Sequence, residues 1–118
     1  MFTNLTPDAQ AHAYRVASLV PHTMRTVALL HDVLEDTDVS LEDFQRAHGA
    51  HVMRSVLVLT RTKAETYMGY LGRVARSGDN TAVAVKLADL RDHLTQLETL
   101  KPSLEKRYKK AFAFLLQS

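Results

Sequence analysis

Histidine and carboxylate residues gather in one short segment, which reads His-Asp-Val-Leu-Glu-Asp from His31 to Asp36. If this segment is helical, residues four apart share a face, so His31 lies beside Glu35 and Asp32 beside Asp36. Four ionisable groups at the end of an otherwise apolar helix carry a desolvation cost that a divalent cation would offset. A solvated helix end that carries acids is the alternative for this segment alone.

Two further segments contain residues of the same kind. His12 lies among small apolar residues, which predicts that it points toward the core; a hydrogen-bonded core histidine is the alternative. The other segment contains Lys86, Asp89 and His93, which are spaced three and four residues apart and therefore form a polar line along one helix. A simple salt bridge is the alternative interpretation of this line. This line could offer a carboxylate to a metal and an ammonium group to a phosphate. Two imidazoles and two carboxylates suit Mn²⁺ or Fe²⁺, with Zn²⁺ as an option and Mg²⁺ disfavoured.

Helices must position these residues, because the whole chain has a helical pattern. Glycine and proline are scarce, at 4 and 3 residues, and apolar residues recur at three- and four-residue spacings. The pattern predicts a compact all-α bundle of six to seven helices in a single domain, 1–118, with the valine-rich stretch 55–59 as the place where a strand is the alternative. The predicted helices span about 7–20, 22–36, 41–48, 50–59, 64–76, 80–97 and 102–115.

Local signals support these boundaries. Thr6 precedes a proline at the first helical position, and Ser40 precedes an acidic first turn. Asn80 is the predicted cap of the helix that carries Asp89. The expected buried stripe of that helix consists of Val83, Leu87, Leu90, Leu94 and Leu97.

Composition narrows the functional classes. The chain has 15 basic and 13 acidic residues and a net charge of +2, too balanced to predict nucleic-acid binding. The most basic stretch, between residues 101 and 110, is expected to be a solvated helix face. Cysteine is absent, which excludes thiolate catalysis, disulfides and cysteine metal sites and fits a cytoplasmic location. No apolar run approaches the roughly 20 residues of a membrane span, and no signal peptide is recognisable.

Four segments, taken in order, resemble those of a known family. They read HAYRVAS at 12–18, ALLHDVLEDT at 28–37, ETYMGY at 65–70 and VKLADL at 85–90. Together they resemble the H…HD…D pattern of the HD superfamily and, more closely, the hydrolase domain of RelA/SpoT-type alarmone enzymes. The resemblance covers roughly residues 12 to 100. It implies an HD-type helical bundle with a divalent metal, most simply Mn²⁺.

The resemblance also implies roles for individual residues. The metal ligands would be His12, His31, Asp32 and Asp89. Glu35 and Asp36 match the acidic pair that handles the attacking water. Lys86 would lie near phosphate, with Arg15 and His93 as further candidates for substrate binding.

The implied reaction is hydrolysis of a phosphorylated nucleotide, with the 3′-pyrophosphate of (p)ppGpp as the first candidate substrate. The alternatives are a nucleoside monophosphate or dinucleotide phosphatase, and a nucleotide-binding HD module without turnover. Two departures from the family concern the substrate. His93 stands where asparagine is usual, and residues 1–11 contain no lysine or arginine. No membrane or nucleic-acid partner is expected, and a homo-oligomer is left open.

Overall fold

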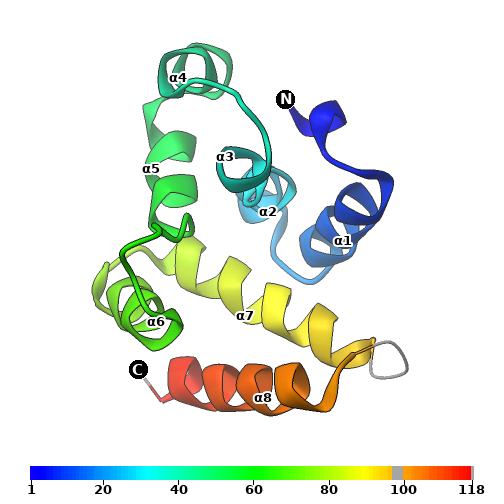
Figure 1. Cartoon of the computed structure of the whole chain (residues 1–118). Helices are drawn as coiled ribbons and strands as arrows, with labels where there is room; N and C mark the ends of the chain where they lie inside the picture. Colours follow the sequence, from blue (N-terminus) through cyan, green and yellow to red (C-terminus); the bar gives the residue numbers. More distant parts are fainter. Residues whose placement is uncertain (97–99, 118) are drawn as a thin grey trace.

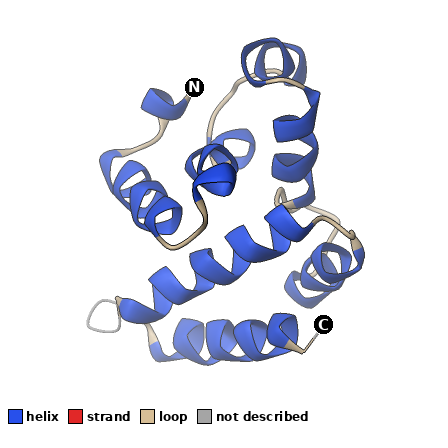
Figure 2. Ribbon diagram, turned by 180° about the vertical axis from the view of Figure 1, so that it is seen from behind, coloured by secondary structure: helices blue, strands red, loops and turns tan. Residues whose placement is uncertain are grey.

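All regular secondary structure is helical in the part of the chain that the computed structural model describes, residues 1–96 and 100–117 (Figures 1 and 2). The all-α prediction is therefore confirmed, and the valine-rich stretch 55–59 contributes to a helix. The elements in chain order are η1 (Phe2–Asn4), α1 (Pro7–Ser18), η2 (His22–Met24), α2 (Arg25–Leu30), α3 (Val33–Asp36), α4 (Leu41–His48), α5 (Ala50–Val58), α6 (Tyr67–Arg76), α7 (Asn80–Thr95) and α8 (Pro102–Leu116).

Side-chain caps start several of these helices, as the sequence signals indicate. Thr6 accepts a hydrogen bond from the backbone N–H of Ala9 at 3.2 Å, and Ser40 accepts one from Asp43 at 3.1 Å. At the end of α4, Gly49 has a φ of +88°, which glycine adopts without strain.

Two predicted helix starts are corrected. The cap of α7 is Asp79 rather than Asn80, because the Asp79 carboxylate accepts the N–H of Ala82 at 2.9 Å. Helix α6 starts at Tyr67 rather than near residue 64. Thr66 caps it, and Arg73 holds the preceding loop by donating to the carbonyl oxygens of Val58 and Thr60, each at 3.0 Å.

The predicted helix over 22–36 is broken into η2, α2 and α3, and this is the largest correction to the fold. Ring atom Nδ1 of His31 lies 2.6 Å from the carbonyl oxygen of Ala28, which in a continuous helix would accept the N–H of Asp32. Asp32 follows with φ −99° and ψ −3°, a sparsely populated backbone region in which many active-site residues lie. His31 and Glu35 therefore lie on either side of a break rather than on one regular helix face.

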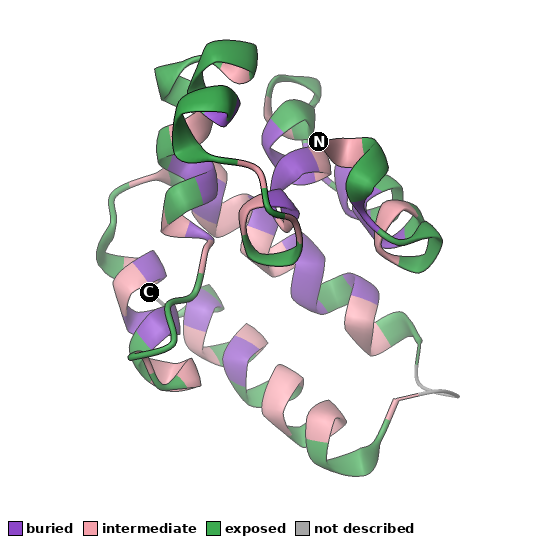
Figure 3. Ribbon diagram, turned by 45° about the horizontal axis from the view of Figure 1, so that its top comes forward, coloured by how far each residue is buried: buried purple, intermediate pink, exposed green. Residues whose placement is uncertain are grey.

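Helix α7 runs through the middle of the molecule, with α1, α2 and α5 on one side and α6 and α8 on the other (Figure 1). The buried residues lie on the faces that the helices turn toward one another (Figure 3). None of the described helices is long and apolar enough to cross a membrane.

The predicted stripe of α7 is only partly right, because neighbours cover this helix on two sides. Leu90 is buried, Val83, Leu87 and Leu94 are half-buried, and Leu97 lies outside the described residues. The buried residues instead include two acids, Asp89 from the polar line and Asp92. The buried residues of α7 are Ala82, Val85, Ala88, Asp89, Leu90 and Asp92. Packing on two sides thus draws carboxylates into the core.

Candidate metal centre and its cavity

Three buried side chains from three parts of the chain converge on one point. His12 comes from α1, His31 from the end of α2 and Asp89 from the middle of α7. Nε2 of His12 lies 2.6 Å from Oδ1 of Asp89, and Nε2 of His31 lies 3.4 Å from the same oxygen. The three potential ligand atoms lie within 4.8 Å of one another. This spacing allows them to bind a single cation.

Acceptors on the far side of each ring orient the two histidines. Nδ1 of His12 lies 2.6 Å from Oδ2 of Asp92, and Nδ1 of His31 lies 2.6 Å from the carbonyl oxygen of Ala28. If these nitrogens donate, Nε2 of each ring is directed at Asp89. Carboxylate and carbonyl acceptors of this kind characterise metal-binding histidines, in which they fix the tautomer and the ring orientation.

Nε2 of His31 is buried and has no hydrogen-bond partner in the described part of the chain. Burial alone would lower the pKa of His31, but the nearby carboxylate of Asp89, aided by the charge of Asp32, raises it to about 9. Burial also acts to lower the pKa of His12, and Asp89 and Asp92 outweigh it so that the net shift is upward. Both rings therefore lie where positive charge is favoured.

Asp89 is the acceptor at the centre of this group. Its own burial would raise its pKa, but the charge of Lys86 and the nearby histidines hold that pKa well below the usual range. Oδ2 of Asp89 accepts a hydrogen bond from Nζ of Lys86 at 2.8 Å. The carboxylate is thus ionised and ready to act as a ligand.

These residues fit a divalent cation. The observation that supports the fit is the buried Nε2 of His31, which lies 3.4 Å from Oδ1 of ionised Asp89 and forms no hydrogen bond within the described residues. Of the four predicted ligands, His12, His31 and Asp89 form the compact group. Asp32 is half-buried beside them, with Oδ2 3.3 Å from His31 Nε2, but it lies outside the group whose atoms are mutually within 4.8 Å.

A cavity of about 260 Å³ opens beside His31. Its acidic lining residues are Asp32 and Glu35, and its basic ones include Lys86. Oε1 of Glu35 accepts the backbone N–H of Arg61 at 2.6 Å. Burial raises the pKa of Glu35, and the charges of Asp32 and Asp36 add to this effect, although the Arg61 N–H opposes it.

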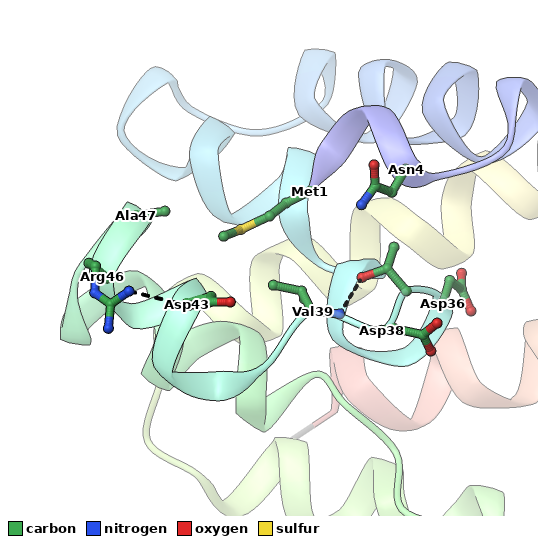
Figure 4. Close-up of a pocket in the computed structure, with 9 residues that line it drawn as sticks. Met1, Asn4, Asp36, Asp38, Val39, Asp43, Arg46 and Ala47 are labelled. Atoms are coloured by element: carbon green, nitrogen blue, oxygen red, sulfur yellow. Dashed lines mark hydrogen bonds and ion pairs between the residues drawn. The ribbon is translucent and has the colours of Figure 1, made fainter.

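The other member of the predicted acidic pair, Asp36, does not line the cavity beside His31. Asp36 lines a separate, larger cavity of about 770 Å³ together with Asp38 and Asp43 (Figure 4). In this cavity Arg46 is paired with Asp43 at 3.3 Å. Burial and the charge of Asp32 raise the pKa of Asp36. Asp36 also lines a further cavity of about 590 Å³ together with Glu35, so the two acids lie next to each other, although only Glu35 lines the cavity beside His31.

The two remaining substrate candidates contact the metal group rather than lining the cavity. Nε of Arg15 donates to Oδ1 of Asp92 at 2.8 Å, so Arg15 supports the carboxylate that orients His12. The ring of His93 is stacked between those of His12 and Tyr108, with centroids 4.5 and 4.8 Å away. Nε2 of His93 also lies 3.3 Å from Oδ1 of Asp89.

Several residues of the site were not predicted from the sequence. Asp92 was assigned no role, although its spacing of three residues from Asp89 was an available signal. Arg107 was expected on a solvated face but lines the cavity, as do Tyr67 and Tyr108. The position of Arg107, three residues after Leu104 and four before Ala111 on the inward face of the helix, was an available signal.

Fold and site together define the chain as an all-helical protein with a buried His–His–Asp group, suited to a divalent metal, beside a cavity that contains basic residues. No protein-family model matches the chain. The chain is similar to two curated proteins, and both carry names that agree with the resemblance seen in the motifs.

The first is a probable guanosine-3′,5′-bis(diphosphate) 3′-pyrophosphohydrolase of Synechocystis sp., 30% identical over 113 residues, which cover 82% of this chain and 15% of that protein. The second is the guanosine-3′,5′-bis(diphosphate) 3′-pyrophosphohydrolase MESH1 of Drosophila melanogaster, 38% identical over 80 residues, which cover 64% of this chain and 44% of that protein. The chain thus spans less than half the length of either relative. The predicted similarity to (p)ppGpp hydrolases is confirmed.

Proposed function

We propose that residues 1–118 form an HD-type, metal-dependent phosphohydrolase domain that acts on a phosphorylated nucleotide, with the 3′-pyrophosphate of (p)ppGpp as the first substrate. The observation that carries this proposal is the buried Nε2 of His31, which forms no hydrogen bond within the described residues and faces ionised Asp89 beside a cavity lined partly by basic side chains. The names of the two similar proteins support the choice of nucleotide.

In this proposal His12, His31 and Asp89 bind the metal, and Asp32 completes the set from its position 3.3 Å from His31 Nε2. Mn²⁺ is the preferred ion, because a mixed set of imidazoles and carboxylates suits it, with Fe²⁺ and Zn²⁺ as further options. When bound, such an ion lowers the pKa of water and neutralises charge on phosphate. Asp92 and Ala28 orient the two rings toward it.

Glu35 is the proposed general base. Its carboxylate lies in the cavity beside Asp32, is held by the backbone N–H of Arg61 and has a raised pKa, which favours proton uptake from an attacking water. Asp36 has a different proposed role. It lines a neighbouring cavity of about 590 Å³ together with Glu35, and because its charge raises the pKa of Glu35, it strengthens the base.

Lys86 is the proposed phosphate-binding residue nearest the metal. Burial would lower the pKa of Lys86, but the charge of Asp89 outweighs burial and raises it, so the ammonium group stays charged. It lines the cavity while it donates to Asp89. Lys86 can therefore both hold a metal ligand and neutralise a substrate oxygen. Arg15 and His93 are proposed as positioning residues, through Asp92 and through the ring of His12 respectively.

A substrate panel tests this function. The protein, loaded with Mn²⁺, would be given (p)ppGpp, a nucleoside monophosphate and a dinucleotide, and released pyrophosphate would be measured separately from phosphate. We expect pyrophosphate from (p)ppGpp, lost on chelation and restored by Mn²⁺. Phosphate from the monophosphate alone would assign the chain to a nucleotide phosphatase. If the protein bound these nucleotides but hydrolysed none of them, the proposed enzymatic activity would be wrong, and the chain would be a nucleotide-binding module.

A further inference from the structure

The carboxylate of Asp89 faces one more imidazole than the two of the candidate metal centre. Nε2 of His12 lies 2.6 Å from Oδ1 of Asp89, and Nε2 of His31 lies 3.4 Å from it. A third imidazole nitrogen, Nε2 of His93, lies 3.3 Å from the same oxygen. The other oxygen, Oδ2, accepts from Nζ of Lys86 at 2.8 Å. Asp89 therefore turns one oxygen toward Lys86 and the other toward three histidines.

The distance between Asp89 and His93 suits two ligands of one ion. Imidazole and carboxylate ligands lie about 2.0–2.2 Å from a divalent cation, so two adjacent ligand atoms lie about 3.0–3.5 Å apart. The 3.3 Å from Asp89 to His93 falls in this range, as does the 3.4 Å from Asp89 to His31. Like Asp32, His93 lies outside the group whose atoms are mutually within 4.8 Å, so both residues are peripheral to that group.

Aromatic contacts on both faces hold the ring of His93 in this position. It is stacked on the ring of His12, with centroids 4.5 Å apart and an angle of 26° between the planes. On its other face lies the ring of Tyr108, at 4.8 Å and 19°. His93 does not line the cavity of about 260 Å³, although Tyr108 does. A ring that is already ordered loses little freedom when it binds an ion, which favours binding.

We propose that His93 is an additional ligand of the metal, so that three imidazoles rather than two bind the ion together with Asp89. This inference rests on the proposed function, and it gives His93 a direct contact with the ion beyond its stacking on His12. Imidazole suits Fe²⁺ and Zn²⁺, whereas carboxylate suits Mn²⁺. A third imidazole therefore moves the metal preference of this chain from Mn²⁺ toward Fe²⁺ and Zn²⁺.

The decisive variant is His93→Phe, compared with His51→Phe. Phenylalanine keeps an aromatic ring between His12 and Tyr108 but has no nitrogen that could bind an ion, so it removes the ligand and retains the stack. His51 is an exposed histidine that lines a different cavity, so its variant makes the same replacement away from the metal. The probe is Co²⁺, titrated into the metal-free protein and followed by visible absorption.

Loss of a ligand should cost at least as much affinity as loss of a group that orients one, for which about 10–100-fold is typical. We expect His93→Phe to weaken Co²⁺ binding by about tenfold or more, to change the spectrum of bound Co²⁺ and to weaken Mn²⁺ binding by a smaller factor. His51→Phe should bind both ions within about twofold of the wild type. An unchanged Co²⁺ spectrum in His93→Phe, whatever its affinity, would overturn the inference, because the atoms bound to Co²⁺ would be the same.

A second measurement, on the wild type, keeps the inference testable if His93→Phe does not fold. X-ray absorption by the Zn²⁺-loaded protein counts bound imidazoles through the scattering from their outer ring atoms. Three bound imidazoles would support His93 as a ligand, and two would overturn it.

The metal measurements and the substrate panel separate this inference from the proposed function. Co²⁺ binding that depends on His93, in a protein that hydrolyses none of the panel, would support the additional ligand and contradict the function. Hydrolysis of (p)ppGpp by a wild type that binds Zn²⁺ through two imidazoles would support the function and overturn the additional ligand. Failure of the wild type to bind any of these ions would overturn both.

Discussion

Asp89 and Glu65 are two carboxylates that each attract several polar groups, and their surroundings differ in one decisive respect. Glu65 accepts from Nε and Nη2 of Arg73, at 2.7 and 3.0 Å, and from the backbone N–H of Thr62 at 3.0 Å. Each of these donors is satisfied by the contact it makes. Asp89 faces His12, His31 and Lys86, and one of these groups, Nε2 of His31, forms no hydrogen bond in the described part of the chain.

The surroundings of the two groups also differ in access and burial. The Asp89 side chain is 7% exposed and lies behind a cavity, while that of Glu65 is 21% exposed and bridges a loop to α6. The comparison shows that charged groups converging on a carboxylate do not by themselves make a functional site. An unsatisfied buried nitrogen and an adjoining cavity distinguish the candidate metal centre from a structural clamp.

The largest expected effect concerns the acids beside the metal group. The double variant Glu35→Gln, Asp36→Asn keeps side-chain shape but removes the proposed base and the charge that strengthens it, so turnover should fall by about 10²–10⁴-fold. Calorimetry should show that Mn²⁺ still binds. Asp38→Asn, an exposed acid two residues further on, is the control. If the double variant turned over substrate near the wild-type rate, the acidic pair would have no role in the reaction and would only be part of a solvated helix end.

Metal binding should stabilise the Asp89 region and leave the Glu65 clamp unaffected. An ion at a hundredfold excess over its dissociation constant contributes about 2.7 kcal/mol to the free energy of unfolding. For a chain of this size that raises the melting temperature on the order of 10 °C. The measurement is thermal unfolding after chelation and again after addition of Mn²⁺.

Matched variants decide what this response means. His31→Ala should abolish the shift in melting temperature, since it removes a ligand, and Glu65→Gln should preserve it. If Mn²⁺ shifted the melting temperature equally in both variants, or did not shift it in the wild type, then Asp89 would not differ from Glu65 as a metal ligand.

A smaller effect is expected at Asp92, which acts on the metal through His12. Asp92→Asn retains the size of the side chain but weakens the acceptor for His12 Nδ1, at present 2.6 Å away. Loss of such an orienting partner typically lowers metal affinity by about 10–100-fold. Competition with a fluorescent chelator would measure it. An affinity no weaker than that of Glu65→Gln would indicate that Asp92 only pairs with Arg15.

The smallest effect is a pH dependence of stability at the clamp. The hydrogen bond from Arg73, aided by Thr62, lowers the pKa of Glu65 from its ordinary 4.5 to about 2. Because the folded state binds this proton more weakly than the unfolded chain, the stabilisation is complete above pH 4.5 and is lost as the pH falls toward 2. Urea unfolding of the wild type and Glu65→Gln should therefore differ at pH 6 and converge toward pH 2. A constant difference would refute the clamp.

The sequence by itself determined the helices and most of the chemistry that they carry. Caps such as Thr6 and Ser40 act within a few residues, and helix periodicity is a local property, so both can be recognised without tertiary contacts. The types and order of His12, His31 and Asp89 likewise predicted a candidate metal group, because imidazoles and carboxylates are suitable ligands for divalent ions.

Only the tertiary structure decided which hydrogen-bond and ion-pair partners those side chains have. The break after α2 depends on the His31 ring taking the Ala28 carbonyl oxygen, and local propensity does not reveal it. The burial of Asp92 follows from packing on two sides of α7, and its contact with His12 joins residues 80 positions apart. Helix periodicity places Arg107 on the face of Leu104 and Ala111, but only the packing of α8 against α6 and α7 brings it onto Tyr67. Such contacts depend on how helices pack, which spacing within one helix cannot specify.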